Sequence, residues 1–174
     1  INAVVLKGRN EGEVVELVKF ARQREIDIAF IEEMPLGLID DHDRVLTFCS
    51  SEELQDIIAA SFPLHPEGDP QGFSGPARFY SMTDSASRVG FISPHSNNFC
   101  HLCNRVRVTV EGRLLLCLGN EHSIDLREIL RGDDYSLEKL KWAIVNAMDI
   151  KPERHYFDNS EAPQIVRFMN MTGG

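Results

Sequence analysis

Long apolar runs, clustered basic residues and a secretion leader are all missing from this sequence of 174 residues. No run approaches the roughly 20 apolar residues that a membrane-spanning helix needs, and no signal peptide is visible. Lys and Arg total 18 against 27 Asp and Glu, which gives a formal net charge of −9. Polymeric nucleic acid and membranes are therefore not expected partners, and any bound phosphate must sit in a local positive pocket.

Internal repeats and low-complexity segments are also absent, and the sequence has only four cysteines. The length suits one domain, or one domain with a small appendage. Cysteines spaced for a metal, in a sequence without a secretion signal, indicate a reducing compartment, so we expect a cytoplasmic protein. The sequence begins at Ile1, inside a strand-like run and without an initiator Met. This start predicts the C-terminal part of a longer protein, because a single unpaired strand is not stable.

Three of the four cysteines have a spacing that is typical of metal ligands. Cys100 and Cys103 form a C-x2-C pair, and Cys117 follows after a hairpin-like stretch. A pair two residues apart can bind one metal from a tight turn, and a hairpin can return a third thiolate to it. Cys49 stands apart and is expected to be an inert buried thiol.

The residues between these cysteines predict a β-hairpin. From position 105 to 110 valines alternate with Arg or Thr, the period of a half-buried strand. A three-residue loop at 110–112, with its glycine in the left-handed conformation, pairs Thr109 with Arg113. This register puts the valines and alternate leucines on one side, and Arg105, Arg107 and the metal-binding sulfur on the other.

Two arginines beside a thiolate-bound metal suit an anionic ligand, because Arg favours bidentate contacts with phosphate. The alternative is that they form a solvated strand face that balances the charge of the thiolates.

The beginning of the chain predicts a βαβ unit with parallel strands. Residues 1–6 and 26–31 are strand-like, and the segment between them has the apolar period of a helix. Asn10 and Glu13 are spaced to form a capping box at the start of that helix.

The residues just past the second strand are candidates for an active site, since parallel α/β folds place their sites at the carboxyl ends of strands. Here these residues are Glu32, Glu33 and Met34. An ordinary core methionine is an equally good interpretation of Met34.

Three further patterns organise the middle of the chain. The Asp-Asp-His-Asp cluster at 40–43 is interpreted as a solvated acidic loop. Ser50 and Glu53 predict a capping box at the start of a helix. Strands near 77–82 and 88–92 are expected to join the metal hairpin in an antiparallel sheet.

Five segments resemble the molybdenum cofactor biosynthesis protein A family, the radical SAM GTP 3′,8-cyclases. The segments are LKGRNEGE, FIEEMPLG, GPARFY, GFISPHSNNFCHLCNRVRVTVEGRLLLCL and the terminal double glycine. The resemblance implies an α/β fold whose residues 1–62 are the C-terminal part of an incomplete TIM-like (α/β) barrel. It further implies that residues 63–174 form an extension, a small antiparallel β-sheet and helices that carry an auxiliary iron–sulfur site.

The resemblance also assigns site residues. Cys100, Cys103 and Cys117 match the ligands of an auxiliary [4Fe-4S] cluster, in which three thiolates leave one iron open to the guanine of GTP. Met34 matches a residue that contacts S-adenosyl-L-methionine (SAM). The residues that match the family's GTP contacts are Arg105, Val106 and Arg107. The residues that match a tail element thought to thread into the site are Gly173 and Gly174.

The reaction implied is the conversion of GTP to (8S)-3′,8-cyclo-7,8-dihydroguanosine 5′-triphosphate, within molybdenum cofactor biosynthesis. SAM and a second [4Fe-4S] cluster serve the complete enzyme, and cyclic pyranopterin monophosphate synthase follows in the pathway. The family's SAM-cleaving C-x3-C-x2-C motif has no match in this sequence, so the chain by itself is expected to be inactive. Ala29 stands where family members commonly have Arg.

Two alternatives remain open. One is a structural Cys3His zinc module, with His101 or His122 as the fourth ligand. The other is the auxiliary-cluster domain of a different radical SAM enzyme. An exposed barrel edge should seek pairing, so a homodimer is one expected state of the isolated piece.

Overall fold

The computed structural model describes residues 1–68, 75–158, 165 and 169–172. The chain divides into two compact units. The first contains Ile1–Met34 and Asp41–Phe99, and the second contains Pro35–Asp40 and Cys100–Gly174. Across the described residues, no helix combines the length and the apolar character that a bilayer crossing requires.

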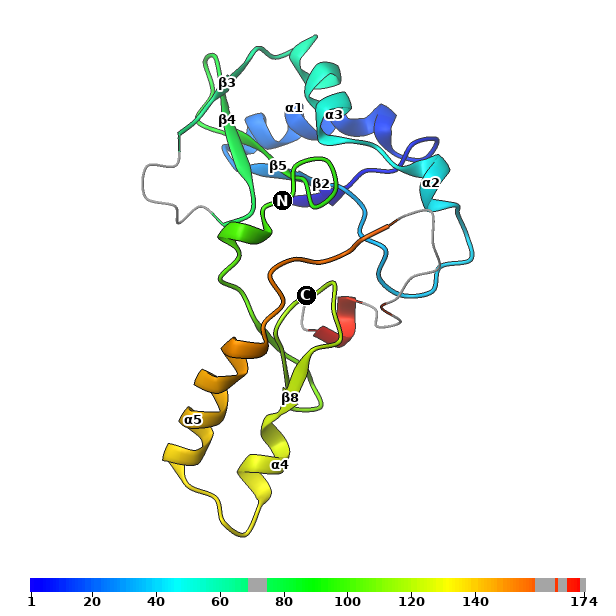
Figure 1. The fold of residues 1–174 in the computed structure, drawn as a ribbon. Helices are drawn as coiled ribbons and strands as arrows, with labels where there is room; N and C mark the ends of the chain where they lie inside the picture. The colour runs from blue at the N-terminus through cyan, green and yellow to red at the C-terminus, as the bar shows by residue number, and fades with distance from the viewer. Residues whose placement is uncertain (69–74, 159–164, 166–168, 173–174) are drawn as a thin grey trace. The chain divides into compact units, whose positions relative to one another are not determined.

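A five-stranded mixed sheet forms the centre of the first unit, in the order β1-β2-β5-β4-β3 (Figure 1). β1, β2 and β5 are parallel, whereas β4 and β3 run antiparallel to their neighbours. The strands are β1 (Asn2–Val4), β2 (Ile28–Ile31), β3 (Leu64–Pro66), β4 (Arg78–Met82) and β5 (Arg88–Ile92). The βαβ unit with parallel strands is therefore confirmed.

One face of this sheet is covered by two helices, α1 (Val14–Arg24) and α3 (Ser51–Ala59). Alternate strand residues such as Phe30 and Phe91 face these helices and are buried. The apolar period of α1 places Val18 in the same core. The hydrophobic effect of burying this face holds the unit together.

The start of α1 differs from the expected capping box. A short 3-10 helix, η1 (Glu11–Glu13), precedes α1, and Asn10 makes no side-chain cap bond to it. The Asn10 amide instead accepts from the Leu6 N–H at 2.8 Å and donates to the Val4 carbonyl at 2.9 Å. The capping-box prediction was wrong here because the turn after β1 offers Asn10 closer backbone partners.

The strands β4 and β5 also pair differently from the expectation. They were expected to join the cysteine hairpin, but β5 lies parallel to β2 in the first sheet, with Val89 opposite Ile28 and Phe91 opposite Phe30. All four of these side chains are buried. Burial of Val89 and Phe91 against the helix-covered face explains why the strand belongs to this sheet.

The second unit has a small antiparallel sheet in the order β6-β7-β8, with helices beside it. The strands are β6 (Arg107–Val108), β7 (Arg113–Leu115) and β8 (Ser123–Asp125). The helices are η2 (Cys100–Leu102), α4 (Leu126–Arg131), α5 (Leu137–Ala147), η3 (Met148–Ile150) and η4 (Met169–Thr172). Its core contains Leu114, Leu116, Leu126 and Ala147. The α/β class and the small antiparallel sheet with helices are thus confirmed.

Candidate functional site

Cys100 and Cys103 are held by one tight turn. Cys100 begins η2, and the Cys103 N–H donates to the Cys100 carbonyl at 3.0 Å. Both side chains are half-buried, and both cysteines are free thiols. This turn keeps two sulfur donors close along the chain, as the C-x2-C spacing predicts.

The hairpin that follows has the predicted register. The Thr109 N–H donates to the Arg113 carbonyl at 2.9 Å, Arg107 lies opposite Leu115, and Gly112 has φ +83°. Only glycine adopts that conformation readily, which explains its place in the loop. The register sets the side of the hairpin on which each residue lies.

The expected sorting of apolar residues is only half right. Leu114 and Leu116 are buried, but Val106, Val108 and Val110 are 40%, 56% and 83% exposed. β6 has two residues and lies at the edge of its sheet. Val108 on this strand therefore does not reach the core that the leucines share with α4 and α5.

Cys117 lies just beyond β7 in a half-buried position. Burial raises the pKa of its thiol, whereas the Gly119 N–H and the Lys151 ammonium lower that pKa. The thiols of Cys100 and Cys103 are near enough to raise the pKa of Cys117 further.

The segment after α5 packs directly on the turn that follows Cys117. A β-carbon added to Gly119 would lie 2.5 Å from Phe157 and 2.7 Å from His155. The rings of His155 and Phe157 are stacked, with their centroids 4.0 Å apart. Gly119 is thus required by close packing, and its amide is held next to the Cys117 sulfur.

The candidate phosphate-binding arginines differ in their surroundings. Arg107 belongs to β6 and is half-buried, whereas Arg105 precedes the strand and is exposed. Arg113 is committed elsewhere, because it donates to the Ser123 hydroxyl at 2.8 Å and lies 3.6 Å from Asp125. Arg105 and Arg107, with Val106 between them, stay the candidate phosphate ligands of the hairpin.

A thiolate-bound metal fits the donor chemistry of this site. Metals bind the deprotonated sulfur; the Gly119 N–H and the Lys151 ammonium lower the pKa of Cys117, but burial holds that pKa above its usual value. Within the described part of the chain, no three His, Cys, Asp or Glu side chains form a group that could hold a metal ion. Metal binding thus requires the three sulfur atoms to draw closer, and the ligand set stays a prediction.

The end of β2 provides a second set of functional groups, in the first unit. Glu32 is 1% exposed and accepts hydrogen bonds from the N–H groups of Ser51, His95 and Ser96 at 2.9, 3.0 and 3.0 Å. The Ser96 hydroxyl donates to the same carboxylate. Burial alone would raise the pKa of Glu32, but these four hydrogen bonds lower it below its usual value. Glu32 thereby joins α3 and the turn after β5 to the end of β2.

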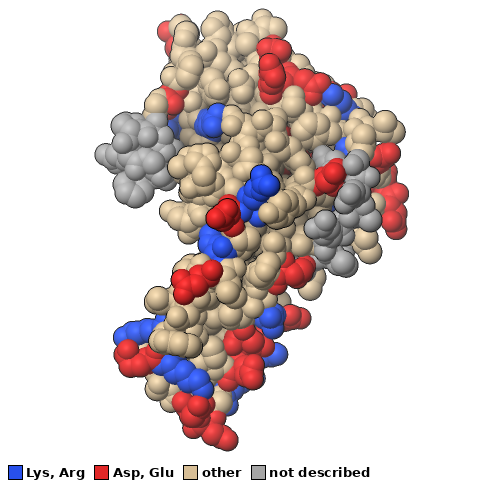
Figure 2. Space-filling view, viewed as in Figure 1, with Lys and Arg blue, Asp and Glu red and all other residues tan. Residues whose placement is uncertain are grey.

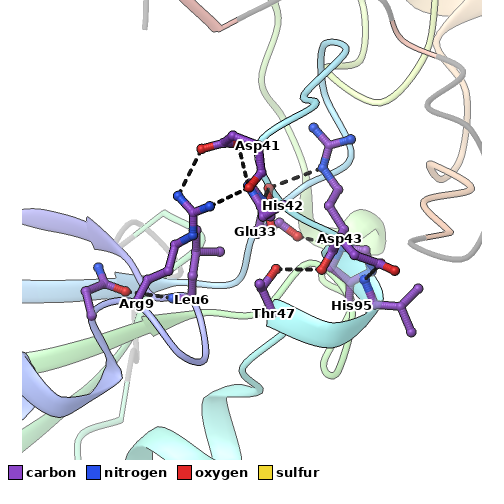
Figure 3. A network of polar contacts seen from close by, with 11 residues as sticks. Leu6, Arg9, Glu33, Asp41, His42, Asp43, Thr47 and His95 are labelled. Atoms are coloured by element: carbon purple, nitrogen blue, oxygen red, sulfur yellow. Dashed lines mark hydrogen bonds and ion pairs between the residues drawn. The ribbon is translucent and has the colours of Figure 1, made fainter.

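Glu33 is the neighbouring buried carboxylate, and it lies in the network of Figure 3. Its Oε1 atom is 2.8 Å from His42 Nε2 and accepts from Arg44 Nε at 3.2 Å. The other ring nitrogen of His42 is 2.8 Å from Asp41. Burial alone would lower the pKa of His42, but the bonds to Asp41 and Glu33 raise it above its usual value.

The solvated interpretation of residues 40–43 was therefore wrong for His42, whose side chain is 7% exposed. The same loop also begins a short helix, α2 (Arg44–Thr47), whose first turn is capped when Asp43 accepts from the Val45 N–H at 2.8 Å. His42 and Arg44 of this segment form a buried ion-pair network with Glu33 that short-range sequence patterns do not reveal.

The remaining predicted residues are placed as follows. Met34 follows Glu33 directly and is half-buried. Ala29 faces the sheet side opposite to the helices. A β-carbon added to the neighbouring Gly90 would lie 3.3 Å from the β-carbon of Ala29. Gly173 and Gly174 lie outside the described residues.

Sequence reasoning missed Lys151 and the role of Glu32. Lys151 donates from its ammonium to the carbonyls of Arg105 and Leu116, far away in sequence. The position of Glu32 directly after a buried strand is a sequence signal for its importance. The hydrogen-bond partners of Glu32, however, could not be identified without the fold.

Charge on the surface is mixed. On the face drawn in Figure 2, Lys and Arg side chains of the described residues are interspersed with Asp and Glu and do not form a continuous basic area. On this face, a phosphate site would therefore have to be local.

A mixed sheet covered by helices, together with three thiols and two arginines on or next to one small hairpin, defines an α/β protein with a thiol-based candidate metal site. The family model described as Molybdenum Cofactor Synthesis C matches residues 26–157. The chain belongs to this family.

Curated relatives match over the whole chain. A GTP 3′,8-cyclase of Marinobacter nauticus is 62% identical over 174 residues, covering 100% of this chain and 52% of that relative. A GTP 3′,8-cyclase of Pseudomonas entomophila is 57% identical, and GTP 3′,8-cyclase 2 of Pseudomonas aeruginosa is 55% identical, each with 100% of this chain and 52% of the relative covered. The chain thus spans about half the length of the curated relatives it matches.

Proposed function

We propose that this chain is the C-terminal portion of a GTP 3′,8-cyclase that acts in molybdenum cofactor biosynthesis. The reaction is the conversion of GTP to (8S)-3′,8-cyclo-7,8-dihydroguanosine 5′-triphosphate. The names of the relatives support this reaction class, and the family match supports the pathway. The observation that carries the proposal is the tight turn that holds Cys100 and Cys103, followed by a hairpin that bears Arg107 and leads to Cys117.

Cys100, Cys103 and Cys117 would hold an auxiliary [4Fe-4S] cluster. Such a cluster, bound by three thiolates, supplies an iron without a protein ligand that can bind the guanine of GTP. The chain's own contribution is to fix the sulfur donors through the η2 turn and the β6–β7 hairpin. Preorganised donors reduce the entropy that binding would otherwise cost.

Arg105 and Arg107 would bind the phosphates of GTP. Guanidinium groups pair with phosphate oxygens through two parallel hydrogen bonds, which orients the nucleotide as well as binding it. Val106, between them and 40% exposed, would contact the nucleotide through its apolar surface. Holding GTP in one orientation is the part of catalysis that this chain would supply.

In the first unit, Met34 would form one wall of the SAM site. It follows two buried carboxylates at the carboxyl end of β2, where α/β folds place their ligands. The three parallel strands with α1 and α3 on one face are what the last part of an α/β barrel would contribute. Residues 1–62 would form this barrel portion, and residues 63–174 would carry the extension. SAM and a second cluster belong to the complete enzyme, so the chain alone would be inactive.

Two experiments test the proposal. After anaerobic purification, the chain should be brown and contain about four irons and four sulfides, and GTP titration should show saturable binding. A colourless chain with one zinc would support the Cys3His module instead. In the described residues the His122 ring is engaged with Asn120, and His101 is exposed. A brown chain that does not bind GTP would indicate an auxiliary-cluster domain with a different substrate.

A further inference from the structure

A strap of residues 41–47 joins the segments that follow β1 and β2, two adjacent parallel strands (Figure 3). Beyond β1, Arg9 donates to the Asp41 carboxylate at 2.9 Å and to the Asp41 carbonyl at 2.6 Å. Beyond β2, the Glu33 carboxylate is 2.8 Å from the ring of His42. Parallel α/β folds bind their ligands at the carboxyl ends of strands. The strap therefore lies where a ligand of the first unit is expected.

Polar contacts, with little apolar packing, hold this strap in place. Within α2, the buried residue is Arg44, whereas Val45 and Leu46 are exposed. Arg44 Nε donates to the Glu33 carboxylate at 3.2 Å. Segments with few buried apolar contacts are the ones that open most readily, so the attachment of the strap depends on its charged groups.

His42 is the part of the strap that responds to a change of charge. Its Nε2 atom is 2.8 Å from Glu33 and its Nδ1 atom is 2.8 Å from Asp41. A neutral imidazole has one N–H, so the ring donates to both carboxylates only when it is protonated. Arg44 contacts Glu33 and Arg9 contacts Asp41, so each of these carboxylates also has a permanent cation beside it. Loss of the proton therefore removes one of the two bonds of His42 and leaves the arginine contacts unchanged.

The closed strap leaves one oxygen of Glu33 without a partner. His42 and Arg44 both contact Oε1, whereas Oε2 is buried and no described residue forms a hydrogen bond with it. Protonation of Glu33 would not help, because the new O–H group would need an acceptor in turn. A buried polar atom without a hydrogen bond costs free energy. Glu33 thus opposes closure, and its Oε2 atom gains partners when the strap opens.

We propose that the strap closes over Glu33 while His42 is protonated, and that its release presents the Glu33 carboxylate to a ligand with N–H or O–H donors. The choice of ligand rests on the proposed function, in which Met34, the next residue, forms a wall of the SAM site. SAM carries such donors in its ammonium, its ribose hydroxyls and its adenine amine. Glu33 is then a ligand-binding residue, and His42 controls access to it.

Backbone hydrogen exchange measures the opening of the strap. The Thr47 N–H donates to the Asp43 carbonyl at 2.9 Å within the strap. Its protection factor should fall as pH rises from about 5.5 to about 8.5, the range in which His42 loses its proton. In His42→Gln, which has no titrating ring, the protection factor should stay constant over this range. The amides of α3 are the control and should keep their protection factors in both proteins.

Titration with S-adenosylhomocysteine tests access to Glu33. The Kd of the wild type should fall over the same pH range, because opening the strap then takes less of the binding free energy. At about pH 8.5, Glu33→Gln should raise the Kd roughly tenfold, since its amide oxygen faces His42 and Arg44 and its NH2 group replaces Oε2. Glu138→Gln is the matched control, the same substitution at an exposed position, and should bind as the wild type does.

Two results would overturn the inference. One is a protection factor of Thr47 that does not change with pH. The other is S-adenosylhomocysteine binding that is absent, or equal in the wild type and Glu33→Gln. An ordered water on Oε2 in place of a ligand would give this second result. If Glu33→Gln fails to fold, the NMR resonance of the Glu33 carboxyl carbon in the wild type decides, because it should shift when S-adenosylhomocysteine is added.

The proposed function is tested separately, by the iron, sulfide and GTP titration of the same chain. A chain that holds a cluster and binds GTP but fails the strap measurements overturns this inference alone. A chain without a cluster overturns the proposed function, whatever the strap does.

Discussion

Arg107 and Leu115 lie directly opposite each other in the β6–β7 ladder. The paired stretch ends here, and Cys117 follows two residues beyond Leu115, outside β7. The candidate phosphate ligand and the candidate metal ligand thus lie near the same end of one hairpin. The proposed function predicts a nucleotide bound beside a metal at this end.

Replacing either candidate phosphate ligand should weaken GTP binding without affecting the metal. Arg105→Ala or Arg107→Ala removes a guanidinium–phosphate contact, which should raise the Kd for GTP roughly tenfold or more. Iron content should stay at the wild-type level, because neither side chain is a sulfur donor. Isothermal titration with GTP and an iron assay check this. Loss of iron in either variant would show that the arginine is structural.

The three clustered thiols should be essential for the metal, and the fourth cysteine should not. Cys117→Ser should lose most of the bound iron and the brown colour, because a hydroxyl is a poor substitute for a thiolate. Cys49→Ala is the control: Cys49 is 2% exposed in the core of the first unit, and burial raises the pKa of its thiol. Equal iron losses in the two variants would contradict the assignment of ligands.

Glu32→Gln should destabilise the protein strongly. Each carboxylate oxygen accepts two hydrogen bonds, Oε1 from the Ser51 N–H and the Ser96 hydroxyl, and Oε2 from the His95 and Ser96 N–H groups. The amide NH2 of Gln must face one of these donor pairs in either orientation. We expect a loss of about 3 kcal/mol in the free energy of unfolding, measured by urea denaturation.

The stabilisation that the Glu32 carboxylate provides should also depend on pH. The pKa of Glu32 is lowered in the folded state, so its stabilisation is present above the unfolded value of about 4.3 and is lost as pH falls through the folded pKa. Glu138→Gln serves as the control, because that side chain is 82% exposed. A similar urea midpoint for both variants would show that the Glu32 network contributes little.

His42 should stabilise the protein more at acidic than at alkaline pH. Its ring bonds to the carboxylates of Asp41 and Glu33, which are themselves in contact with Arg9 and Arg44. The pKa of His42 is raised by folding, so its contribution is complete below the unfolded value of about 6.5 and is lost as pH rises through the folded pKa.

The test compares the wild type with His42→Gln by urea unfolding between about pH 5.5 and pH 8.5, a range in which the carboxylates stay ionised. The difference in unfolding free energy should shrink as pH rises. A constant difference, or one that grows with pH, would show that the imidazolium form of His42 is not the one that folding favours.

Gly112→Ala should destabilise the hairpin. Gly112 has φ +83°, and an added β-carbon would lie 2.9 Å from the β-carbon of Arg127. A left-handed conformation alone costs a residue with a side chain roughly 1–2 kcal/mol. Gly12→Ala is the matched control, since it has no atom within 4 Å of the added carbon. Urea unfolding should separate the two variants, and equal midpoints would refute the role of the turn.

Local signals were sufficient for several elements. Ser50 and Glu53 form the predicted capping box at the start of α3, with the Glu53 N–H donating to the Ser50 hydroxyl at 3.2 Å. The three-residue loop ending at Gly112, and hence the hairpin register, was likewise predictable. In both cases the interacting residues are close in sequence, so the pattern and the contact coincide.

Long-range contacts account for what the sequence did not reveal. Lys151 reaches residues 46 and 35 positions away, and Glu32 accepts from Ser96, 64 positions away. Asn10 is a local exception: its side-chain amide bonds to the backbone of Val4 and Leu6 in place of capping η1. Burial of His42 depends on Glu33, which lies on another element. Such partners are defined only after the chain has folded.

The division of the chain illustrates the same limit. Residue 62 falls within the first compact unit, between α3 and β3, and strands β3 to β5 share the sheet of β1 and β2. Strand-like patterns at 78–82 and 88–92 were visible in the sequence, but the pattern does not say which sheet a strand joins. The division at residue 62 into a barrel portion and an extension stays a prediction.

The most direct test is the content of iron, inorganic sulfide and zinc in the chain after anaerobic purification. Three thiolates that share one cluster predict about four irons and about four sulfides per chain, with no zinc. One zinc per chain without sulfide would contradict the cluster and leave a structural zinc module as the function of Cys100, Cys103 and Cys117.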